Sequence, residues 1–169
     1  MKAIDLSKYI IAKHDLVDEF ISNKKLQKLL YYIEAWALVH IGSIIDDEFE
    51  AWVHGPVIHE VYQTYRHFGY SPISFTYPNN EPNASKFIAD FENEYIENGG
   101  NSNVFKLIDS VLNEYNELNA FQLEYLTHNE DPWMFARKDV FPHGHSNNII
   151  SKDIMKEYYT KQMLEEIES

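Results

Sequence analysis

The chain has 169 residues, of which 44% are hydrophobic and 15% aromatic, and its formal net charge is −13. A chain of this length can bury roughly two-thirds of its unfolded surface, so we expect a single domain over residues 1–169. The absence of cysteine excludes disulfides and thiolate chemistry. The acidic balance disfavours direct nucleic-acid binding, because phosphate attracts positive charge, and it suits a basic protein partner.

The sequence gives no sign of a membrane or secretory segment. Asp5 and Lys8 interrupt any apolar run near the start, which argues against a signal peptide. No stretch approaches the roughly 18 apolar residues of a membrane-spanning helix. We therefore expect a cytoplasmic protein that does not contact a membrane.

The first two predicted helices cover residues 3–21 and 24–42. Ser22 or Asn23 can end the first helix and cap the second. The second segment, "KKLQKLLYYIEAWALVHIG", places apolar residues at helical spacing, and Gly42 can end it. This stripe is apolar enough that we expect it to form the core.

The next stretch alternates between strand and helix patterns. Residues 49–54, "FEAWVH", alternate in polarity as a short strand does. We expect Gly55 to allow a turn and Pro56 to open a helix that ends at Gly69, because proline fits the first helical turn. Residues 72–77, "PISFTY", alternate again and can pair with the first strand as a two-stranded ribbon.

The rest of the chain predicts further helices joined by polar loops. We expect a loop at 78–85, and Asn119 with Gln122 forms a capping-box pattern. Ser151 can cap a last helix over 152–167. The predicted fold is mainly α, one compact domain of about six to eight helices with a possible two-stranded ribbon at about 49–54 and 72–77.

The histidines raise the possibility of a metal site. They flank the Gly-Pro pair and recur in two later segments: His54, His59, His128, His143 and His145. No HExxH pattern or cysteine pair accompanies them, and no GxSxG or glycine-rich phosphate loop is present. We expect no metal, no cofactor and no catalytic residue; a metal-dependent enzyme is the weakest alternative.

The tyrosines outnumber what the predicted core stripes need. Tyrosine and tryptophan are favoured anchors of protein interfaces, because they bury much area at small entropic cost. We therefore expect several of them to lie on the surface. The alternative is that they border a small core. The tyrosines concerned are Tyr9, Tyr31, Tyr62, Tyr65, Tyr70, Tyr158 and Tyr159.

Four pieces of the chain together resemble one known family. They are "KLQKLLYY" (25–32), "AW" (35–36), "EAWVHGPVIHEVYQTYRHFG" (50–69) and "LTHNEDPW" (126–133). In content, order and spacing they are similar to the Panacea domain of SocA-like antitoxins, over about residues 24–135, with flanking N- and C-terminal helices. The residues that carry the resemblance are Trp36, Gly55, Pro56, Val57, His128, Pro132 and Trp133.

The resemblance implies an antitoxin that neutralises a cognate toxin, encoded by a neighbouring gene, by direct binding. Two alternatives are a proteolytic adaptor that delivers the toxin to a Clp protease, and a phage or mobile-element protein that binds a host factor. Residues 70–118 match no family piece, and partner choice can be encoded there. Our candidate partner-binding residues are Trp52, Tyr62, Tyr65, Arg66, Gln27 and Lys28. We expect Tyr62, Tyr65 and Arg66 on the surface of the helix after the Gly-Pro pair, and Gln27 and Lys28 exposed on the polar edge of the second helix.

Overall fold

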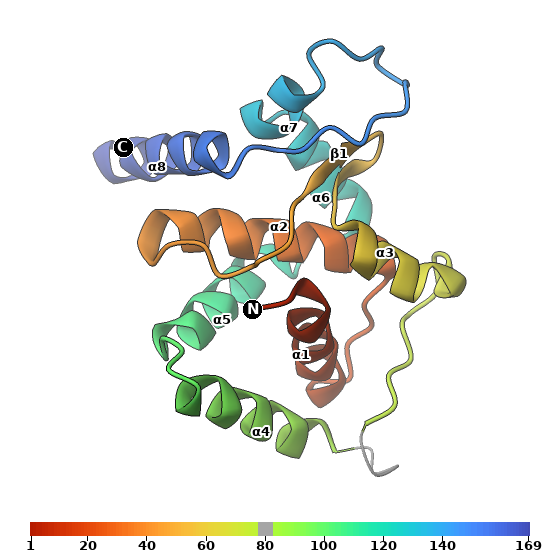
Figure 1. Ribbon diagram of the computed structural model, residues 1–169, viewed down its shortest axis with the longest axis vertical. Coiled ribbons are helices and arrows are strands. Elements are labelled where there is room, and N and C mark those ends of the chain that lie inside the picture. The colour runs from red at the N-terminus through yellow and green to blue at the C-terminus, as the bar shows by residue number, and fades with distance from the viewer. Residues whose placement is uncertain (78–82) are drawn as a thin grey trace.

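The computed structural model describes residues 1–77 and 83–169 and consists mainly of helices (Figure 1). The predicted loop at 78–85 falls largely outside these residues. The helices are α1 (Ala3–Leu16), α2 (Asn23–His40), α3 (His59–Tyr65), α4 (Ala84–Glu97), α5 (Asn103–Tyr115), α6 (Ala120–His128), α7 (Asp131–Ala136) and α8 (Lys152–Glu168). A 3-10 turn, η1 (Arg66–Phe68), extends α3, and the strands are β1 (Glu50–Trp52) and β2 (Gly55–Val57).

Side-chain caps fix several helix starts where the sequence predicts them. The Ser22 hydroxyl accepts a hydrogen bond from the Lys25 amide at 3.3 Å, and Ser151 caps α8 in the same way. Asn119 and Gln122 form a reciprocal capping box at the start of α6. The first helix is shorter than expected, because Asp18 adopts a left-handed backbone conformation (φ 54°) soon after Leu16.

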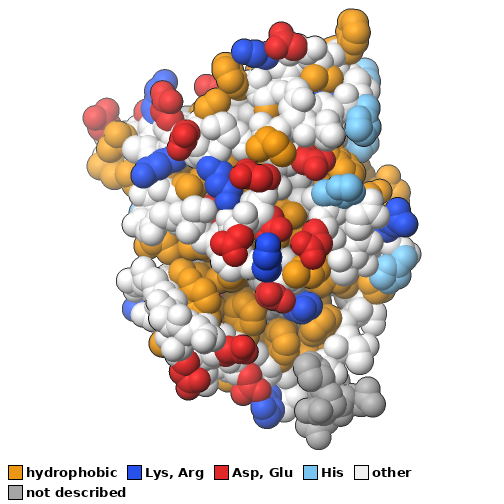
Figure 2. All heavy atoms as spheres, in the orientation of Figure 1, with side chains coloured by type: hydrophobic (Ala, Val, Ile, Leu, Met, Phe, Trp, Pro, Cys, Tyr) orange, Lys and Arg blue, Asp and Glu red, His pale blue; other side chains and the backbone are white. Residues whose placement is uncertain are grey.

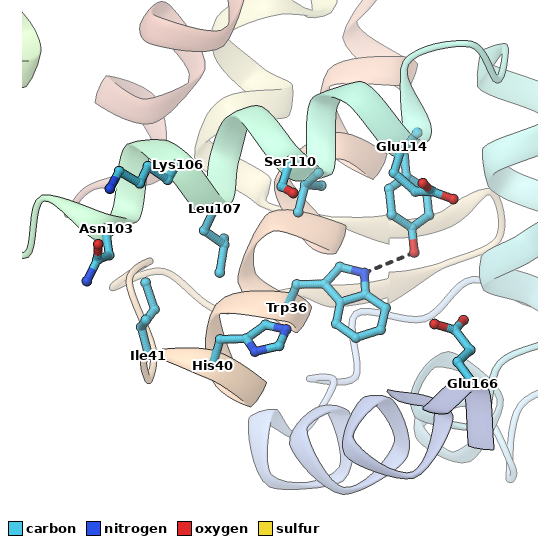
Figure 3. Close-up of a pocket in the computed structure, with 11 residues that line it drawn as sticks. Trp36, His40, Ile41, Asn103, Lys106, Leu107, Ser110, Glu114 and Glu166 are labelled. Atoms are coloured by element: carbon cyan, nitrogen blue, oxygen red, sulfur yellow. Dashed lines mark hydrogen bonds between the residues drawn. The ribbon is translucent and has the colours of Figure 1, made fainter. Parts of the chain in front are cut away.

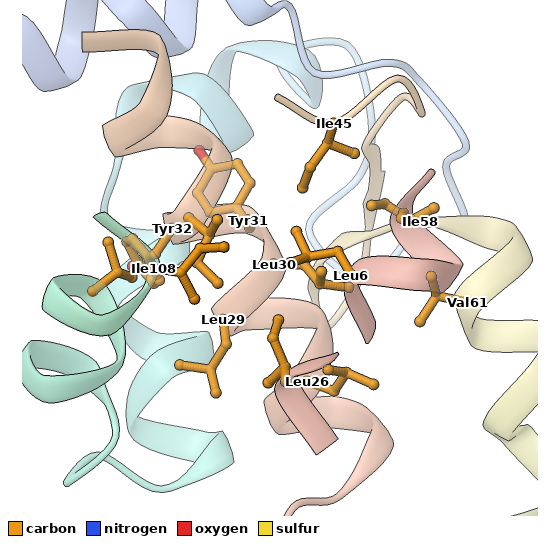
Figure 4. Packing of buried hydrophobic residues seen from close by; sticks show 14 of the residues in the cluster. Leu6, Leu26, Leu29, Leu30, Tyr31, Tyr32, Ile45, Ile58, Val61 and Ile108 are labelled. Atoms are coloured by element: carbon orange, nitrogen blue, oxygen red, sulfur yellow. The ribbon is translucent and has the colours of Figure 1, made fainter. Parts of the chain in front are cut away.

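Helix α2 runs through the centre of the molecule, and most other elements pack around it. It contacts α1, α3, α5, α6, α8 and β2. Figure 4 shows Leu26, Leu29 and Leu30 of α2 pointing into the cluster that Leu6 and Ile108 complete from α1 and α5. Burial on nearly every side of α2 is possible because its apolar residues cover more than one face.

A second layer is built from aromatic side chains of α1, α4 and α5. The ring of Tyr9 packs against Phe91 and Phe105 at centroid distances of 5.0 and 5.4 Å. The Tyr9 hydroxyl donates to Glu92 Oε1 at 2.5 Å, which satisfies the polar end of a buried ring. Helix α4, which no family piece covers, is thereby held against α1.

The two-stranded ribbon exists, but the prediction of its second strand was wrong. β1 pairs antiparallel with β2, with Glu50 opposite Val57 and Trp52 opposite Gly55. Gly55 has φ +97°, which lets the chain reverse at once after Val53 and His54. Pro56 therefore lies in a strand and does not open a helix; the helix begins only at His59, after the extended Ile58.

Residues 72–77 form an extended segment that begins beside the stretch of chain joining α1 to α2. Pro72 makes an isolated bridge with Ser22, and the Ile73 amide donates to the Ile21 carbonyl at 2.9 Å. The alternating pattern is real, since Ile73 and Tyr77 are buried and Phe75 is half-buried. The pattern identified an extended chain but could not identify its partner.

The mainly α fold with one short antiparallel sheet is confirmed for the described residues. None of the helices in the described part combines the length and apolar content that crossing a lipid bilayer requires.

Candidate partner-binding site

Five of the six candidate binding residues line one groove, although they come from separate segments. We call it the hairpin groove and define it by Lys24, Gln27, Lys28, Trp52, Tyr62 and Arg66. Its volume is about 320 Å³, and it lies between the N-terminal half of α2, the β1–β2 hairpin and α3 with η1. Folding therefore brings two family pieces, 25–32 and 50–69, to one place.

Lys28 is buried, although the helical pattern predicted it on the polar edge of α2. Its side chain is 1% exposed, and Nζ donates to the Pro56 carbonyl at 3.0 Å. Burial lowers its pKa to about 7, while the nearby Glu124 carboxylate acts in the opposite direction. The expectation of a solvated lysine was wrong because the hairpin folds over this edge of the helix.

Gly55 makes room for Lys28. A Cβ atom at position 55 would lie 2.6 Å from Lys28 Cε and 2.9 Å from Thr127 Oγ1. The sequence predicted this glycine only as a turn residue. Its positive φ and this close approach give it two independent reasons to be glycine.

Gln27 is also buried, where we expected it to be exposed. Its Oε1 accepts a hydrogen bond from the Ile58 amide at 2.8 Å, and its Nε2 donates to the Ile58 carbonyl at 3.4 Å. The side chain thus satisfies the backbone of the residue before α3. Gln27 supports the floor of the groove and presents little surface to a partner.

Two aromatic side chains form one wall of the groove. The rings of Trp52 and Tyr62 meet edge to face, with centroids 4.8 Å apart. The Trp52 indole N–H donates to Glu50 Oε2 at 2.6 Å, which fixes the ring. Both side chains are half-buried and offer an accessible apolar surface.

Tyr65 and Arg66 have different environments although they are adjacent. Tyr65 is 6% exposed and belongs to the core, where burial raises its pKa to about 12, so the prediction that it lies on the surface was wrong. Arg66 is exposed, lines the groove, and takes part in no ion pair of the described residues. Tyr9, Tyr31 and Tyr159 are buried too, so the tyrosine excess largely fills the core.

The "LTHNEDPW" piece holds the hairpin from behind. The His128 ring stacks on Trp133 with centroids 4.1 Å apart, and the Trp133 indole donates to the Trp52 carbonyl at 2.9 Å. Arg137, which sequence reasoning missed, donates to the Ala51 carbonyl at 2.7 Å. Pro132 is buried at the start of α7, as its position after Asp131 predicts.

A small charge network closes one end of the groove. Glu124 pairs with Lys24 and accepts from His54 Nδ1, the latter at 3.0 Å. Burial alone would raise the pKa of Glu124, but these two partners bring it below its usual range. Burial lowers the pKa of His128, whose Nε2 lies 4.0 Å from Glu124 Oε1. The sequence offered no signal for Glu124, because the contact joins segments far apart in the chain.

Three histidines of the metal hypothesis lie around the hairpin, and two lie in the loop before α8. The Nε2 atoms of His59 and Gln63 are hydrogen-bonded at 2.9 Å. The His59 ring lies beside that of Trp52, with centroids 6.1 Å apart. In the described ranges, 1–77 and 83–169, no three histidine or acidic side chains are arranged to hold a metal ion.

A second hollow, of about 540 Å³, lies between the end of α2, α5 and the end of α8 (Figure 3). Trp36 lies at its centre and donates from its indole nitrogen to the Tyr115 hydroxyl at 3.0 Å. Lys106, Glu114 and Glu166 line it, so its charges are mixed. The bond to Tyr115 indicates that Trp36 joins α2 to α5.

The acidic side chains do not form one continuous field on the face drawn in Figure 2. Acidic and basic groups are mixed over its middle, and hydrophobic side chains gather below them. On this face the acidic residues therefore do not form one patch. The lining of the hairpin groove differs from the chain as a whole, because none of its described residues is acidic.

Residues 26–134 match the family described as Antitoxin SocA-like, Panacea domain. The chain belongs to this family. No curated protein and no solved structure matches it significantly. The matched range begins in α2 and ends in α7, so it contains most of the hairpin groove and the segment that supports it.

Within this SocA-like domain, the signature residues have mainly structural contacts. Gly55 and Pro56 accommodate and bind Lys28, and His128 and Trp133 support the hairpin. Val57 is buried and also borders the groove. The family pieces thus build the groove, while its accessible walls come from Trp52, Tyr62 and Arg66.

Proposed function

We propose that this chain is an antitoxin that neutralises a cognate toxin protein by binding it directly in the cytoplasm. The observation that carries the proposal is the match of residues 26–134 to the SocA-like antitoxin family. We propose a binding role without catalysis, metal or cofactor. The net charge of −13 favours a toxin that is basic overall.

The hairpin groove is the surface that we propose for toxin contact. It combines a fixed aromatic wall, Trp52 and Tyr62, with an exposed guanidinium, Arg66. Tryptophan, tyrosine and arginine are the side chains that most often dominate binding energy at protein interfaces. Neutralisation needs a dissociation constant of roughly nanomolar, about −12 kcal/mol, which a standard interface with a few such anchors can reach.

Co-expression with the product of the adjacent open reading frame tests the proposal. We expect that product to arrest growth when it is expressed alone and growth to recover when this chain is present. A product that is harmless alone would remove the support for an antitoxin. In that case a phage or mobile-element protein that binds a host factor becomes the better account.

The half-life of the toxin separates masking from delivery to a protease. If the chain masks the toxin, the toxin should persist at the same level in cells with and without the Clp protease. A toxin that disappears only when both this chain and the Clp protease are present would favour the adaptor alternative.

A further inference from the structure

The hairpin groove has a charge opposite to that of the whole chain. The sequence has 27 acidic and 14 basic residues, so acids outnumber bases about two to one. None of the 11 described residues that line the groove is acidic, whereas Lys24, Lys28 and Arg66 are basic. The side chains that line the groove therefore carry positive and no negative charge, with the carboxylates of Glu124 and Glu50 next to Lys24 and Trp52.

Lys28 has hydrogen-bonding capacity that the described residues do not use. A protonated lysine has three donors, and among these residues the only hydrogen bond of its Nζ is to the Pro56 carbonyl at 3.0 Å. The side chain is 1% exposed, yet it reaches the groove wall. Burial of a cation with one neutral acceptor is costly unless an anion is supplied.

Arg66 provides a second, accessible positive charge. Lys24 differs from it, because the Glu124 carboxylate already pairs with Lys24. The two cations that an incoming anion can pair with are therefore Lys28 and Arg66. Apolar surfaces of Trp52, Tyr62 and the largely exposed Tyr70 line the same groove.

We propose that the hairpin groove receives a segment of the toxin in which an apolar side chain lies next to a carboxylate. This inference rests on the proposed antitoxin function. The apolar side chain packs on Trp52 and Tyr62, and the carboxylate pairs with Lys28 and Arg66. The groove volume, about 320 Å³, is at the lower end of the roughly 300–1,000 Å³ of ligand pockets and suits one or two side chains.

A singly charged carboxylate fits this groove better than a phosphate. The aromatic wall offers apolar contact that a free phosphate cannot use.

The test is to titrate the full chain with small ligands and to monitor binding through the NMR signals of its tryptophan indole groups. The probes are acetyl-Asp-Phe-Glu-amide, its uncharged match acetyl-Asn-Phe-Gln-amide, and ATP. We expect the acidic peptide to shift the Trp52 indole signal and to bind at least fivefold more tightly than the uncharged peptide. Arg66→Gln and Lys28→Met should each weaken the acidic peptide at least fivefold, while Lys156→Gln, at an exposed position on α8, should leave it unchanged.

Three results would overturn the proposal. They are equal affinity for the two peptides, tighter binding of ATP than of the acidic peptide, and no shift at 10 mM peptide. Because Arg66 is exposed, its variant keeps the test valid if Lys28→Met fails to fold.

Neutralisation by the same variants separates this inference from the proposed function. If wild type and Arg66→Gln neutralise the toxin equally well, the groove assignment fails and the antitoxin function stands. If wild type does not neutralise the toxin but still binds the acidic peptide selectively, the function fails and the anion site stands.

Discussion

At the residue scale, the buried lysine is the feature that distinguishes this groove. Lys28 lies inside the molecule with a pKa near 7, where a hydrophobic side chain of similar size would fit without the cost of desolvating a charge. Stability alone does not explain such a residue. A carboxylate bound in the hairpin groove, as we propose, would account for it, because a nearby anion favours the protonated form of the lysine.

The pH dependence of unfolding tests the state of Lys28. Its pKa is about 7 in the folded protein, against 10.5 for a lysine in water, so the unfolded chain binds the proton more tightly. Stability from this group is therefore present at high pH and is lost as pH falls toward 7. We expect the free energy of unfolding of wild type, relative to Lys28→Met, to rise by about 2 kcal/mol between pH 7 and 9 in urea titrations.

The exposed variant Lys156→Met is the control for that measurement, because its side chain faces solvent in both states. A pH-independent difference between wild type and Lys28→Met would contradict the assignment of a depressed pKa to Lys28.

Gly55 allows a second test with an internal control. Gly55 and Gly42 have similar positive φ values, +97° and +92°, but a Cβ meets Lys28 and Thr127 at Gly55 and nothing within 4 Å at Gly42. Gly42→Ala should cost about 1 kcal/mol of backbone strain, and Gly55→Ala about 1–3 kcal/mol more. Chemical denaturation measures both; equal losses would mean that the close approach to Lys28 does not matter.

At the element scale, side chains far apart in sequence join the helices in a way that periodicity cannot reveal. Glu130, just before α7, accepts hydrogen bonds from Tyr32 of α2 and Tyr159 of α8, at 3.1 and 2.5 Å to Oε2. Burial raises its pKa to about 7, although both hydroxyl groups act to lower it. One carboxyl group thus ties three helices together.

The raised pKa of Glu130 predicts a loss of stability with increasing pH. The folded protein holds the Glu130 proton more tightly than the unfolded chain does. The stabilising contribution of Glu130 to the free energy of unfolding is therefore complete below about pH 4.5 and is lost as pH rises through about 7. Glu130→Gln keeps a neutral hydrogen-bonding group at this position. It should remove a pH-dependent part of the free energy of unfolding on the order of 3 kcal/mol. Thermal melts from pH 4.5 to 8 measure it.

Glu157→Gln, on the exposed side of α8, serves as the comparison for Glu130→Gln. If the melting temperatures of Glu130→Gln and wild type changed in parallel over this pH range, Glu130 would not be the titrating group.

The sequence predicted the helices well and their tertiary surroundings less well. Caps at Ser22, Asn119 and Ser151 are local, so they were readable from the chain. The hairpin was missed because "GP" was taken as a helix start, and the strand pairing depends on the positive φ of Gly55. Gln27 and Lys28 were placed on a polar edge because a helical pattern does not show that a second element covers that edge.

At the scale of the whole molecule, α2 forms much of the core and also contributes to the hairpin groove, the surface that we propose for binding. Its apolar residues fill the core shared with α1, α5 and α8 (Figures 1 and 4). Residues of its N-terminal half line the hairpin groove. Five of the six candidate binding residues line this groove, and only Tyr65 belongs to the core. The family pieces and the candidate site therefore coincide in space.

The central claim is direct binding of a toxin, and calorimetric titration of the purified chain with the purified product of the adjacent gene tests it most directly. We predict a saturable complex with a dissociation constant of roughly nanomolar, without any protease present. Absence of binding at micromolar concentrations, in a pair for which co-expression restores growth, would contradict the account.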